Sequence, residues 1–318
     1  MPSSKALVVV TSLWLLILNI EAAPSFVYHT CINTTTYTPN STFQSNLNLL
    51  LSVLSSNSAH KWFYTATVGD DASSLAIGLF LCRGDVTIEV CNDCVVNAGK
   101  DLVQRCPRDE VAYIWYDECM LRYDNRSFVG SMGDAPWEWF WYGSDVTEPN
   151  HFAQVLGGIM DGLATRASSN QPLDDQNVTR FATGEANFSS LLNIYGLAQC
   201  TPDLSGIDCY RCLRLCIGVL AGCCNGKPRA RVLHASCNLR YDMFPFYRSN
   251  MMFPFNSSTA RAPPLTRATS SGGEGKISKH TFIALVAPIV ASLALLAIGL
   301  CLLVGKQRRK YNSLEKEN

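Results

Sequence analysis

The chain has 318 residues, enough for two domains of about a hundred residues each with extensions at both ends. Its 26 Lys and Arg residues balance its 26 Asp and Glu residues, so the net charge does not favour nucleic acid or an acidic substrate as a partner. Fourteen cysteines indicate a secreted protein, because a cytosolic protein with so many thiols normally uses them to bind metal.

The N-terminal residues have the three-part pattern of a secretory signal peptide. Lys5 precedes an apolar run from Ala6 to Ile20, and the small residues Ala22 and Ala23 follow it. This run is short for a membrane span, which needs about 20 apolar residues. We therefore predict a signal peptide over residues 1–23 and an extracellular location for the domains that follow.

One cysteine pattern occurs twice in the chain at a constant offset. Three cysteines recur at positions whose differences, 200−82, 209−91 and 212−94, all equal 118. The same offset relates Cys106 to Cys224, Cys119 to Cys237, residues 121–124 to 239–242 and residues 78–79 to 196–197. A fixed period of this kind indicates a tandem duplication of one cysteine-framed domain.

The first repeat alternates between helical and strand-like segments. Apolar residues follow helical spacing at 43–54 and 91–103. Aromatic and β-branched residues favour strands at 63–67 and 111–120, and the apolar density at 74–82 suits a third strand. Two helices on an antiparallel sheet predict an α+β domain, and the duplication predicts two of them in tandem.

Residues 131–150 separate the repeats and are rich in aromatic side chains. These are Trp137, Trp139, Phe140, Trp141 and Tyr142. One hypothesis is a lectin-like platform for sugars. We favour the other, that the rings pack where two domains meet, because aromatic clusters bury a large area. The segment is therefore predicted to be an aromatic linker between domains at residues 26–130 and 151–250.

The second repeat opens with a helix predicted over residues 152–167. Val155, Ile159, Met160 and Leu163 form one apolar stripe along it. Residues 261–279, beyond the repeat, are rich in Pro, Ser, Thr and Gly, so we predict a flexible stalk over 251–280.

Residues 281–305 contain no charged side chain. At about 1.5 Å per residue, a helix over this segment exceeds the ~30 Å hydrocarbon core, so we predict one transmembrane helix. Four basic residues follow at once, namely Lys306, Arg308, Arg309 and Lys310. They predict a cytoplasmic tail over 306–318 and an extracellular N-terminus.

Six Asn-x-Ser/Thr sequons lie on the side predicted to be extracellular, and none lies in the predicted tail. The candidate glycosylation sites are Asn33, Asn40, Asn125, Asn177, Asn187 and Asn256.

The sequence shows no constellation of catalytic residues. The five histidines are scattered outside nucleophile and metalloprotease motifs, and there is no Gly-rich phosphate loop. His234, beside Cys237, is expected to be structural. Two Cys-x-x-Cys pairs suggest zinc, but the oxidising compartment and a further cysteine upstream of each pair favour disulfides. We expect no enzymatic activity, no cofactor and no metal.

The spacing Cys82-x8-Cys91-x2-Cys94, with Cys-Asn-Leu-Arg-Tyr at 237–241, resembles the plant ginkbilobin-type domain, also called the salt-stress/antifungal domain. Two copies with a signal and one span are similar to the ectodomain of a cysteine-rich receptor-like kinase. Further matching segments are 78–85, 115–119, 181–187 and 200–205. The resemblance covers residues 26–317.

The resemblance implies that the cysteines are structural. The pairs it implies are Cys31–Cys106, Cys82–Cys91, Cys94–Cys119, Cys200–Cys209 and Cys212–Cys237. Each bridge contributes about 2–4 kcal/mol by restricting the unfolded chain. Because Cys301 lies in the predicted span, thirteen cysteines are extracellular, and an odd number leaves one without a partner in the chain.

Cys216, Cys223 and Cys224 are left to share one bridge. A bond between the neighbours Cys223 and Cys224 would strain the backbone. On an unbroken helix Cys216 and Cys223 would be about 10 Å apart, beyond the ~7 Å bridging limit. Gly222 could end the helix and turn the chain back. We therefore favour Cys216 paired with Cys223 or Cys224, and a third thiol that is free or bonded to a partner chain.

The resemblance also implies a sugar site, because a mannose-binding member of the family uses an Asn, an Arg and an acid near its cysteines. The matching positions in repeat one hold Ile32, Tyr113 and Asp124. Repeat two lacks the first cysteine but has Arg231 and Asp242 at the other two positions. These two are candidate carbohydrate-binding residues, with an ion pair between strands as the alternative.

The function implied is an extracellular recognition module, anchored in the plasma membrane, of a plant cysteine-rich receptor-like protein in stress or defence signalling. It would bind an extracellular ligand or a partner ectodomain and signal through partners such as a co-receptor kinase. Membrane lipid would surround its span, and we expect no nucleic-acid partner. The tail is too short for a kinase. Two explanations for the short tail stay open. The protein has no kinase domain, or this chain is a shortened form of a longer one that carries a Ser/Thr kinase.

Two alternative functions remain open. A plasmodesmata-located protein that regulates cell-to-cell traffic shares two such domains, one span and a short tail. A mannose-binding antifungal lectin would use the same domain for sugar recognition.

Overall fold

Both repeats lie within the same structural unit of the chain. The computed structural model describes residues 23–32, 34–71, 73–133, 137–169, 171–174 and 177–248. The predicted stalk, span and tail lie outside these residues, as does the predicted signal peptide up to residue 22. Among the described residues, no helix combines the length and apolar character needed to cross a membrane.

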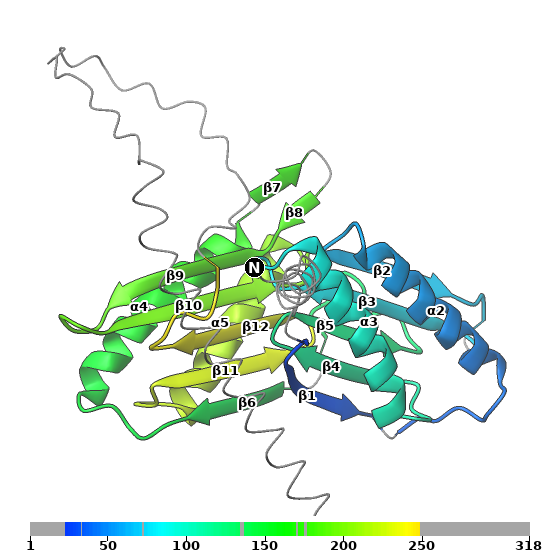
Figure 1. Cartoon of the computed structure of the whole chain (residues 1–318), viewed down its shortest axis with the longest axis horizontal. Helices are drawn as coiled ribbons and strands as arrows, with labels where there is room; N and C mark the ends of the chain where they lie inside the picture. Colours follow the sequence, from blue (N-terminus) through cyan, green and yellow to red (C-terminus); the bar gives the residue numbers. More distant parts are fainter. Residues whose placement is uncertain are drawn as a thin grey trace, which may run out of the picture. The chain divides into compact units, whose positions relative to one another are not determined.

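The first repeat is a five-stranded antiparallel sheet with two helices packed on one face (Figure 1). The strand order is β1-β4-β5-β3-β2. The elements are β1 (Phe26–Cys31), α2 (Thr42–Ser58), β2 (Phe63–Val68), β3 (Ala76–Cys82), α3 (Ile88–Arg105), β4 (Ala112–Tyr116) and β5 (Cys119–Asp124).

The second repeat has the same architecture, with sheet order β6-β11-β12-β10-β9. Its elements are β6 (Trp137–Tyr142), α4 (Pro149–Ser168), β9 (Phe181–Asn187), β10 (Asn193–Cys200), α5 (Gly206–Cys223), β11 (Arg229–His234) and β12 (Cys237–Asp242). A short hairpin that the sequence did not predict, β7 (Gln171–Asp174) with β8 (Asn177–Thr179), lies between α4 and β9. The expected fold of two tandem α+β domains is therefore confirmed.

The duplicated helices begin at matching capping residues. The side chain of Thr87 accepts a hydrogen bond from the backbone N–H of Val90 at 3.3 Å, and that of Ser205 accepts one from Asp208 at 3.0 Å. Both satisfy an N–H that has no partner within the helix. Because of this cap, α3 begins three residues before the predicted residue 91.

The segment predicted as one strand at 111–120 is two strands. Asp117 and Glu118 form the turn between β4 and β5, which then pair antiparallel with Trp115 opposite Met120. Side chains alternate along β4, so Ile114 enters the core under the helices whereas Trp115 points to the opposite face. The hairpin therefore supplies residues to both faces of the sheet.

The aromatic segment is not a simple linker. Trp137–Tyr142 form β6, the edge strand of the second sheet, and pair with β11 from Arg229 to His234. β6 has the same place in its sheet as β1 in the first sheet. It begins 137−26 = 111 residues after β1, so the offset of 118 does not reveal the correspondence.

Each repeat has its own core between its helices and its sheet. An equivalent hydrogen bond from a tyrosine hydroxyl occurs in both cores. The Tyr123 hydroxyl donates to the backbone oxygen of Asp109 at 3.1 Å, and the Tyr241 hydroxyl donates to that of Lys227 at 3.0 Å. Both tyrosines are fully buried. The duplication therefore preserved a buried polar contact as well as the sulfur framework.

Candidate functional site

The structure joins ten cysteines in the five pairs that the resemblance implies. They are Cys31–Cys106, Cys82–Cys91, Cys94–Cys119, Cys200–Cys209 and Cys212–Cys237. In both repeats one bridge joins the end of β3 or β10 to the following helix, and a second joins that helix to the start of β5 or β12. The bridges therefore hold α3 and α5 on their sheets in the same way.

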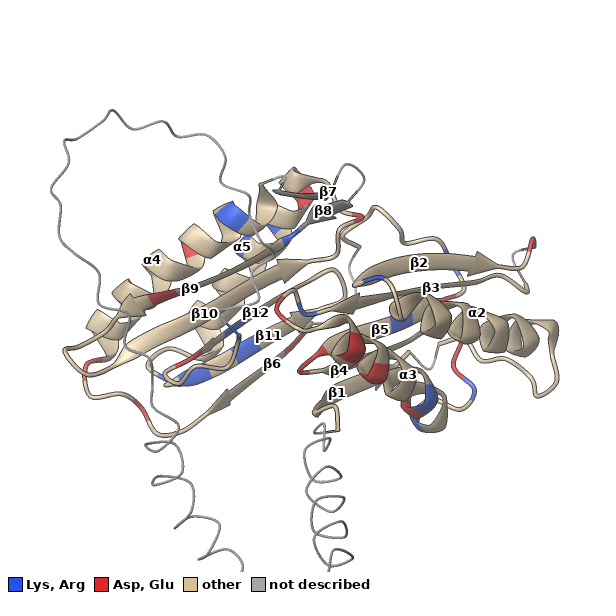
Figure 2. Cartoon of the chain, turned by 45° about the horizontal axis from the view of Figure 1, so that its top comes forward, with Lys and Arg blue, Asp and Glu red and all other residues tan. Residues whose placement is uncertain are grey.

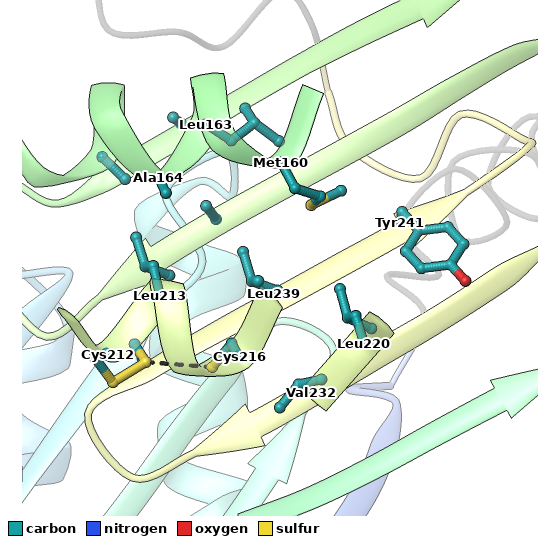
Figure 3. Close-up of a cluster of buried hydrophobic side chains, with 14 of the residues drawn as sticks. Met160, Leu163, Ala164, Cys212, Leu213, Cys216, Leu220, Val232, Leu239 and Tyr241 are labelled. Atoms are coloured by element: carbon teal, nitrogen blue, oxygen red, sulfur yellow. Dashed lines mark hydrogen bonds between the residues drawn. A yellow bond between two sulfur atoms is a disulfide. The ribbon is translucent and has the colours of Figure 1, made fainter. Parts of the chain in front are cut away.

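The favoured pairing of the last three cysteines is wrong, but one of the three thiols is left unpaired as expected. Cys223 and Cys224 bond to each other, and Cys216 is a free, buried thiol. Helix α5 continues through Gly222 to Cys223, so Cys216 stays 223−216 = 7 residues, about 10 Å, away along the axis. Cys216 lies instead against the Cys212–Cys237 bridge, with its Sγ 3.5 Å from that of Cys237 (Figure 3).

His234 is buried beside this bridge. Its Nδ1 accepts a hydrogen bond from the backbone N–H of Ser236 at 3.2 Å and lies 3.4 Å from Cys212 Sγ. The ring packs on Trp137 with centroids 4.3 Å apart. Burial, together with the positive charge of Arg122, lowers the pKa of His234 to about 4, so the imidazole is neutral at physiological pH.

The two repeats meet through a hydrophobic cluster on the sheet faces opposite their helices. Repeat one contributes Leu79, Leu81, Val111, Tyr113, Trp115 and Met120, and repeat two contributes Leu233 and Ala235. Phe140 of β6 packs against the cluster, with its ring 5.6 Å from that of Tyr28. This contact supports the favoured hypothesis for Phe140, whereas Trp139, Trp141 and Tyr142 are about half exposed.

Asp117, in the turn between β4 and β5, links the repeats electrostatically. Its carboxylate accepts hydrogen bonds from Arg231 at 2.5 Å and from Arg240 at 3.2 Å. Burial acts to raise the pKa of Asp117, but the two guanidinium groups outweigh it and hold this pKa below its usual range. A cavity of about 50 Å³ beside the pair is too small for a ligand larger than water.

The ion pair between Arg231 and Asp242, which was the alternative to a sugar site, does not form. Arg231 pairs with Asp117 of the other repeat, whereas Asp242 lies 4.0 Å from both Arg229 and Arg240. The cause is the packing of the two repeats, which brings Asp117 closer to Arg231 than the acid on its own sheet.

Arg231 and Asp242 nevertheless line one pocket on the second sheet. We call it the arginine pocket; it has a volume of about 190 Å³ and is lined by Tyr142, Arg229, Ala230, Arg231, Arg240, Tyr241 and Asp242. Figure 2 shows the basic residues of β11 and β12 on this sheet. Three guanidinium groups face two carboxylates, Asp242 and Asp117, so the pocket has one positive charge in excess. It can accept a hydroxylated or an anionic group.

The matching surface of repeat one is closed. The residues 118 positions before Arg229, Arg231, Arg240 and Asp242 are Val111, Tyr113, Arg122 and Asp124, and all four are buried. Val111 and Tyr113 belong to the cluster between the repeats, and Ile32 packs against it. The sugar-site positions of repeat one are therefore covered, whereas those of repeat two line a pocket.

An aromatic ring covers the matched arginine in both repeats. The guanidinium of Arg122 lies 3.8 Å from the ring centre of Phe128, and that of Arg240 lies 4.0 Å from that of Phe246. Phe246 follows Phe128 by 118 residues. What differs between the repeats is thus the surrounding residues rather than the arginine itself.

The candidate glycosylation sites differ in exposure. Asn40 and Asn187 are exposed, and Asn177 lies in β8. Asn125 is half-buried, and its Nδ2 donates to Glu110 at 2.7 Å. Asn33 and Asn256 lie outside the described residues.

Sequence reasoning missed Asp117, Arg229 and Arg240 as site residues, and it named Tyr142 only under the less favoured hypothesis of a sugar platform. The available clue was a difference between matched positions, because Asp117 corresponds to Ala235 and Arg229 to Val111. Residues that differ between two copies of one fold mark the places where the copies have different contacts.

Comparisons with known proteins agree with the framework of two repeats. The salt stress response/antifungal family model matches residues 30–126 and 142–243. The chain is 39% identical to cysteine-rich receptor-like protein kinase 25 of Arabidopsis thaliana, over 96% of this chain and 45% of that protein. It is 40% identical to an antimicrobial ginkbilobin-2-like protein of Castanea crenata, over 69% of this chain and 88% of that protein.

A solved structure has the same fold. The tandem DUF26 ectodomain of the Arabidopsis thaliana cysteine-rich receptor-like protein PDLP8 superposes with a TM-score of 0.61 at 27% identity, covering 70% of this chain and 99% of that one. The chain spans less than half the length of the receptor-like kinase. The family matches together cover more than half of the chain, which therefore belongs to the salt stress response/antifungal family and carries its domain in two tandem copies.

Proposed function

We propose that the chain is the extracellular recognition module of a membrane-anchored plant receptor-like protein, and that its second repeat binds a ligand bearing an acidic group. The main support for this proposal is the arginine pocket of the second repeat. Arg229 is about half exposed, and Tyr142 beside it offers an exposed ring on which a sugar could stack. The matched surface of repeat one is buried, so the two repeats have different roles.

The charge of the pocket favours a carboxylate over a neutral ligand. Asp117 and Asp242 compensate two of the three guanidinium groups, which leaves one available for a bidentate contact with a carboxylate. Binding of the purified full chain to polygalacturonic acid and to neutral mannan tests this. The proposal predicts retention on polygalacturonic acid that falls with added salt. Retention on mannan alone would contradict it.

Retention on mannan alone would instead favour the antifungal-lectin alternative. The similarity to the antimicrobial ginkbilobin-2-like protein supports that alternative, because the two proteins align over most of the smaller one. Both hypotheses use Arg231. Its pairing with Asp117, however, leaves fewer of its N–H groups available to donate hydrogen bonds to neutral hydroxyl groups.

The proposed topology places the glycosylated repeats outside the cell and residues 306–318 in the cytoplasm. Exposure of Asn40 and Asn187 is compatible with glycans at these positions. Protease added to intact cells should degrade the repeats and spare a tag fused after Asn318. Digestion of that tag from outside would reverse the orientation.

We propose that the described repeats signal through partners and have no catalytic activity of their own. The similarity to the receptor-like kinase covers 45% of that protein and includes both repeats, which supports a recognition role. Phosphate transfer from ATP by the purified full chain, free of partner kinases, would refute this.

A plasmodesmata-located protein is the second candidate function. The structural similarity to the PDLP8 ectodomain supports it, since that chain is matched over 99% of its length. A fluorescent fusion distinguishes the two candidates. Uniform labelling of the plasma membrane favours the receptor-like protein, and punctate labelling at wall junctions favours the plasmodesmata-located protein.

A further inference from the structure

Three sulfur atoms and one imidazole nitrogen converge in the core of the second repeat. Cys216 Sγ lies 3.5 Å from Cys237 Sγ, and Cys212 Sγ lies 3.4 Å from His234 Nδ1. The donor atoms of Cys212, His234 and Cys237 all lie within 4.8 Å of one another. Figure 3 shows Cys216 one helical turn beyond Cys212, next to the bridge. All four residues are buried.

We propose that reduction of the Cys212–Cys237 bridge converts this cluster into a Zn²⁺ site with three thiolate ligands and one histidine ligand. Tetrahedral zinc has Zn–S bonds of about 2.3 Å and Zn–N bonds of about 2.0–2.1 Å, which place sulfurs roughly 3.8 Å apart and sulfur and nitrogen roughly 3.6 Å apart. The pairs Cys216–Cys237 and Cys212–His234 already have nearly these separations. The bonded pair Cys212–Cys237 must move apart, and Cys216, which lies outside the group of donors within 4.8 Å of one another, must move closer to Cys212 and His234.

The chemistry requires an external two-electron reductant, here a dithiol; the phosphine of the test replaces it and is oxidised to its oxide, with water supplying the oxygen and the two protons. The dithiol is oxidised to its disulfide, and its two electrons and two protons break the S–S bond and leave Cys212 and Cys237 as thiols. Zn²⁺ then displaces one proton from each of the three thiols, so three protons are released on binding. The site carries a net charge of −1, spread over three sulfurs.

The histidine already has the tautomer that the site requires. Nδ1 accepts a hydrogen bond from the backbone N–H of Ser236, so its lone pair lies on Nδ1 and the ring proton on Nε2. Zinc binding at Nδ1 replaces this 3.2 Å hydrogen bond. The tilted contact with Trp137, with ring centres 4.3 Å apart, holds the imidazole in place while the metal enters.

Repeat one is an internal control for the proposal. Its matching bridge, Cys94–Cys119, has Ala98 where repeat two has Cys216 and Tyr116 where it has His234, because 216−118 = 98 and 234−118 = 116. Reduction there exposes only two sulfurs. A different cluster, Cys31, Cys106 and Asp109, also has donors within 4.8 Å of one another, and it is the main competitor.

The test uses the full chain, reduced with a phosphine and titrated with Zn²⁺. Near-ultraviolet circular dichroism monitors the fold, and alkylation followed by mass spectrometry identifies the protected thiols. We expect one zinc per chain and protection of Cys212, Cys216 and Cys237. Because loss of an outer-shell partner alone lowers metal affinity about 10–100-fold, C216S should weaken binding by at least about 100-fold. D109N should leave it unchanged.

Three results would overturn the proposal. They are the lack of zinc binding to the folded, reduced chain, equal affinity of C216S, and protection of Cys31 and Cys106 with sensitivity to D109N. If reduction itself abolishes the near-ultraviolet signal, zinc is added during refolding. The proposal then requires the signal to return in the wild type and not in C216S. Recovery in both proteins, or in neither, contradicts it.

Discussion

The two repeats have the same fold, but different bonds stabilise it and different parts of its surface are exposed. In repeat one the Cys31–Cys106 bridge joins the first strand to the end of α3, and the sheet face opposite the helices is covered. In repeat two the counterpart of Cys106 is Cys224, which bonds only to its neighbour, and the same sheet face has a charged pocket. One copy is therefore a closed support, whereas the other has an open surface.

The difference in bridging also changes how each first strand is held. β1 is joined covalently through Cys31, whereas β6 depends on its pairing with β11 and on the packing of Trp137 against His234. Hydrogen bonds and ring contacts replace a disulfide that the second copy lacks.

Removal of the Cys31–Cys106 bridge should have the largest effect. The bridge closes a loop of 75 residues, so its loss as C31A/C106A should lower the free energy of unfolding by about 4 kcal/mol. Chemical denaturation monitored by tryptophan fluorescence measures this change. A loss below about 1 kcal/mol would show that the covalent connection of β1 is not a major support.

Loss of the charge at Asp117 should have an intermediate effect. D117N leaves Arg231 without its counter-charge and Arg240 with only Asp242, 4.0 Å away, so we expect a loss of about 2 kcal/mol. Denaturation at several pH values measures it, with D70N, an exposed aspartate outside this network, as the control.

The pH dependence of this effect has a definite sign. The folded-state pKa of Asp117 is below its unfolded value, so its contribution is present above the unfolded pKa and is lost as the pH falls through the folded pKa. The wild type and D117N should therefore converge in strong acid. A difference that grows on acidification would contradict the assignment.

Removal of the Cys223–Cys224 bridge should have the smallest effect. Its sequence separation is 1, so it closes almost no loop in the unfolded chain. We expect C223A/C224A to change the free energy of unfolding by less than about 1 kcal/mol. A loss as large as that of C31A/C106A would mean that the two bridges have equivalent structural roles.

The duplicated framework could be predicted from the sequence because cysteine spacing fixes it locally. Helix α5 occupies Gly206–Cys223, which is Ile88–Arg105 of α3 displaced by 118 residues at both ends. β6 could not be found in this way, because its distance from β1 differs from that offset. Its aromatic composition was compatible with a strand and with a packed linker.

The pairing of Asp117 with Arg231 was also beyond prediction, because it depends on how two folded repeats pack. Nothing in the local periodicity of either segment records that contact. Whether Cys216 could form a disulfide depended on whether α5 ends at Gly222. A glycine near a helix end is compatible with a helix that ends there and with one that continues. The candidate sugar residues of repeat two were identified, but their actual partners were not.

Binding by two arginine variants tests most directly whether the second repeat is the recognition surface. R229A removes the guanidinium exposed in the arginine pocket, and R211A removes one exposed on α5 of the same repeat. Equilibrium binding of each full chain to polygalacturonic acid is compared with the wild type. Loss of a charge-assisted contact of about 1.5–3 kcal/mol predicts that R229A binds at least about tenfold more weakly. R211A should bind like the wild type. Equal binding by R229A and R211A would contradict the account.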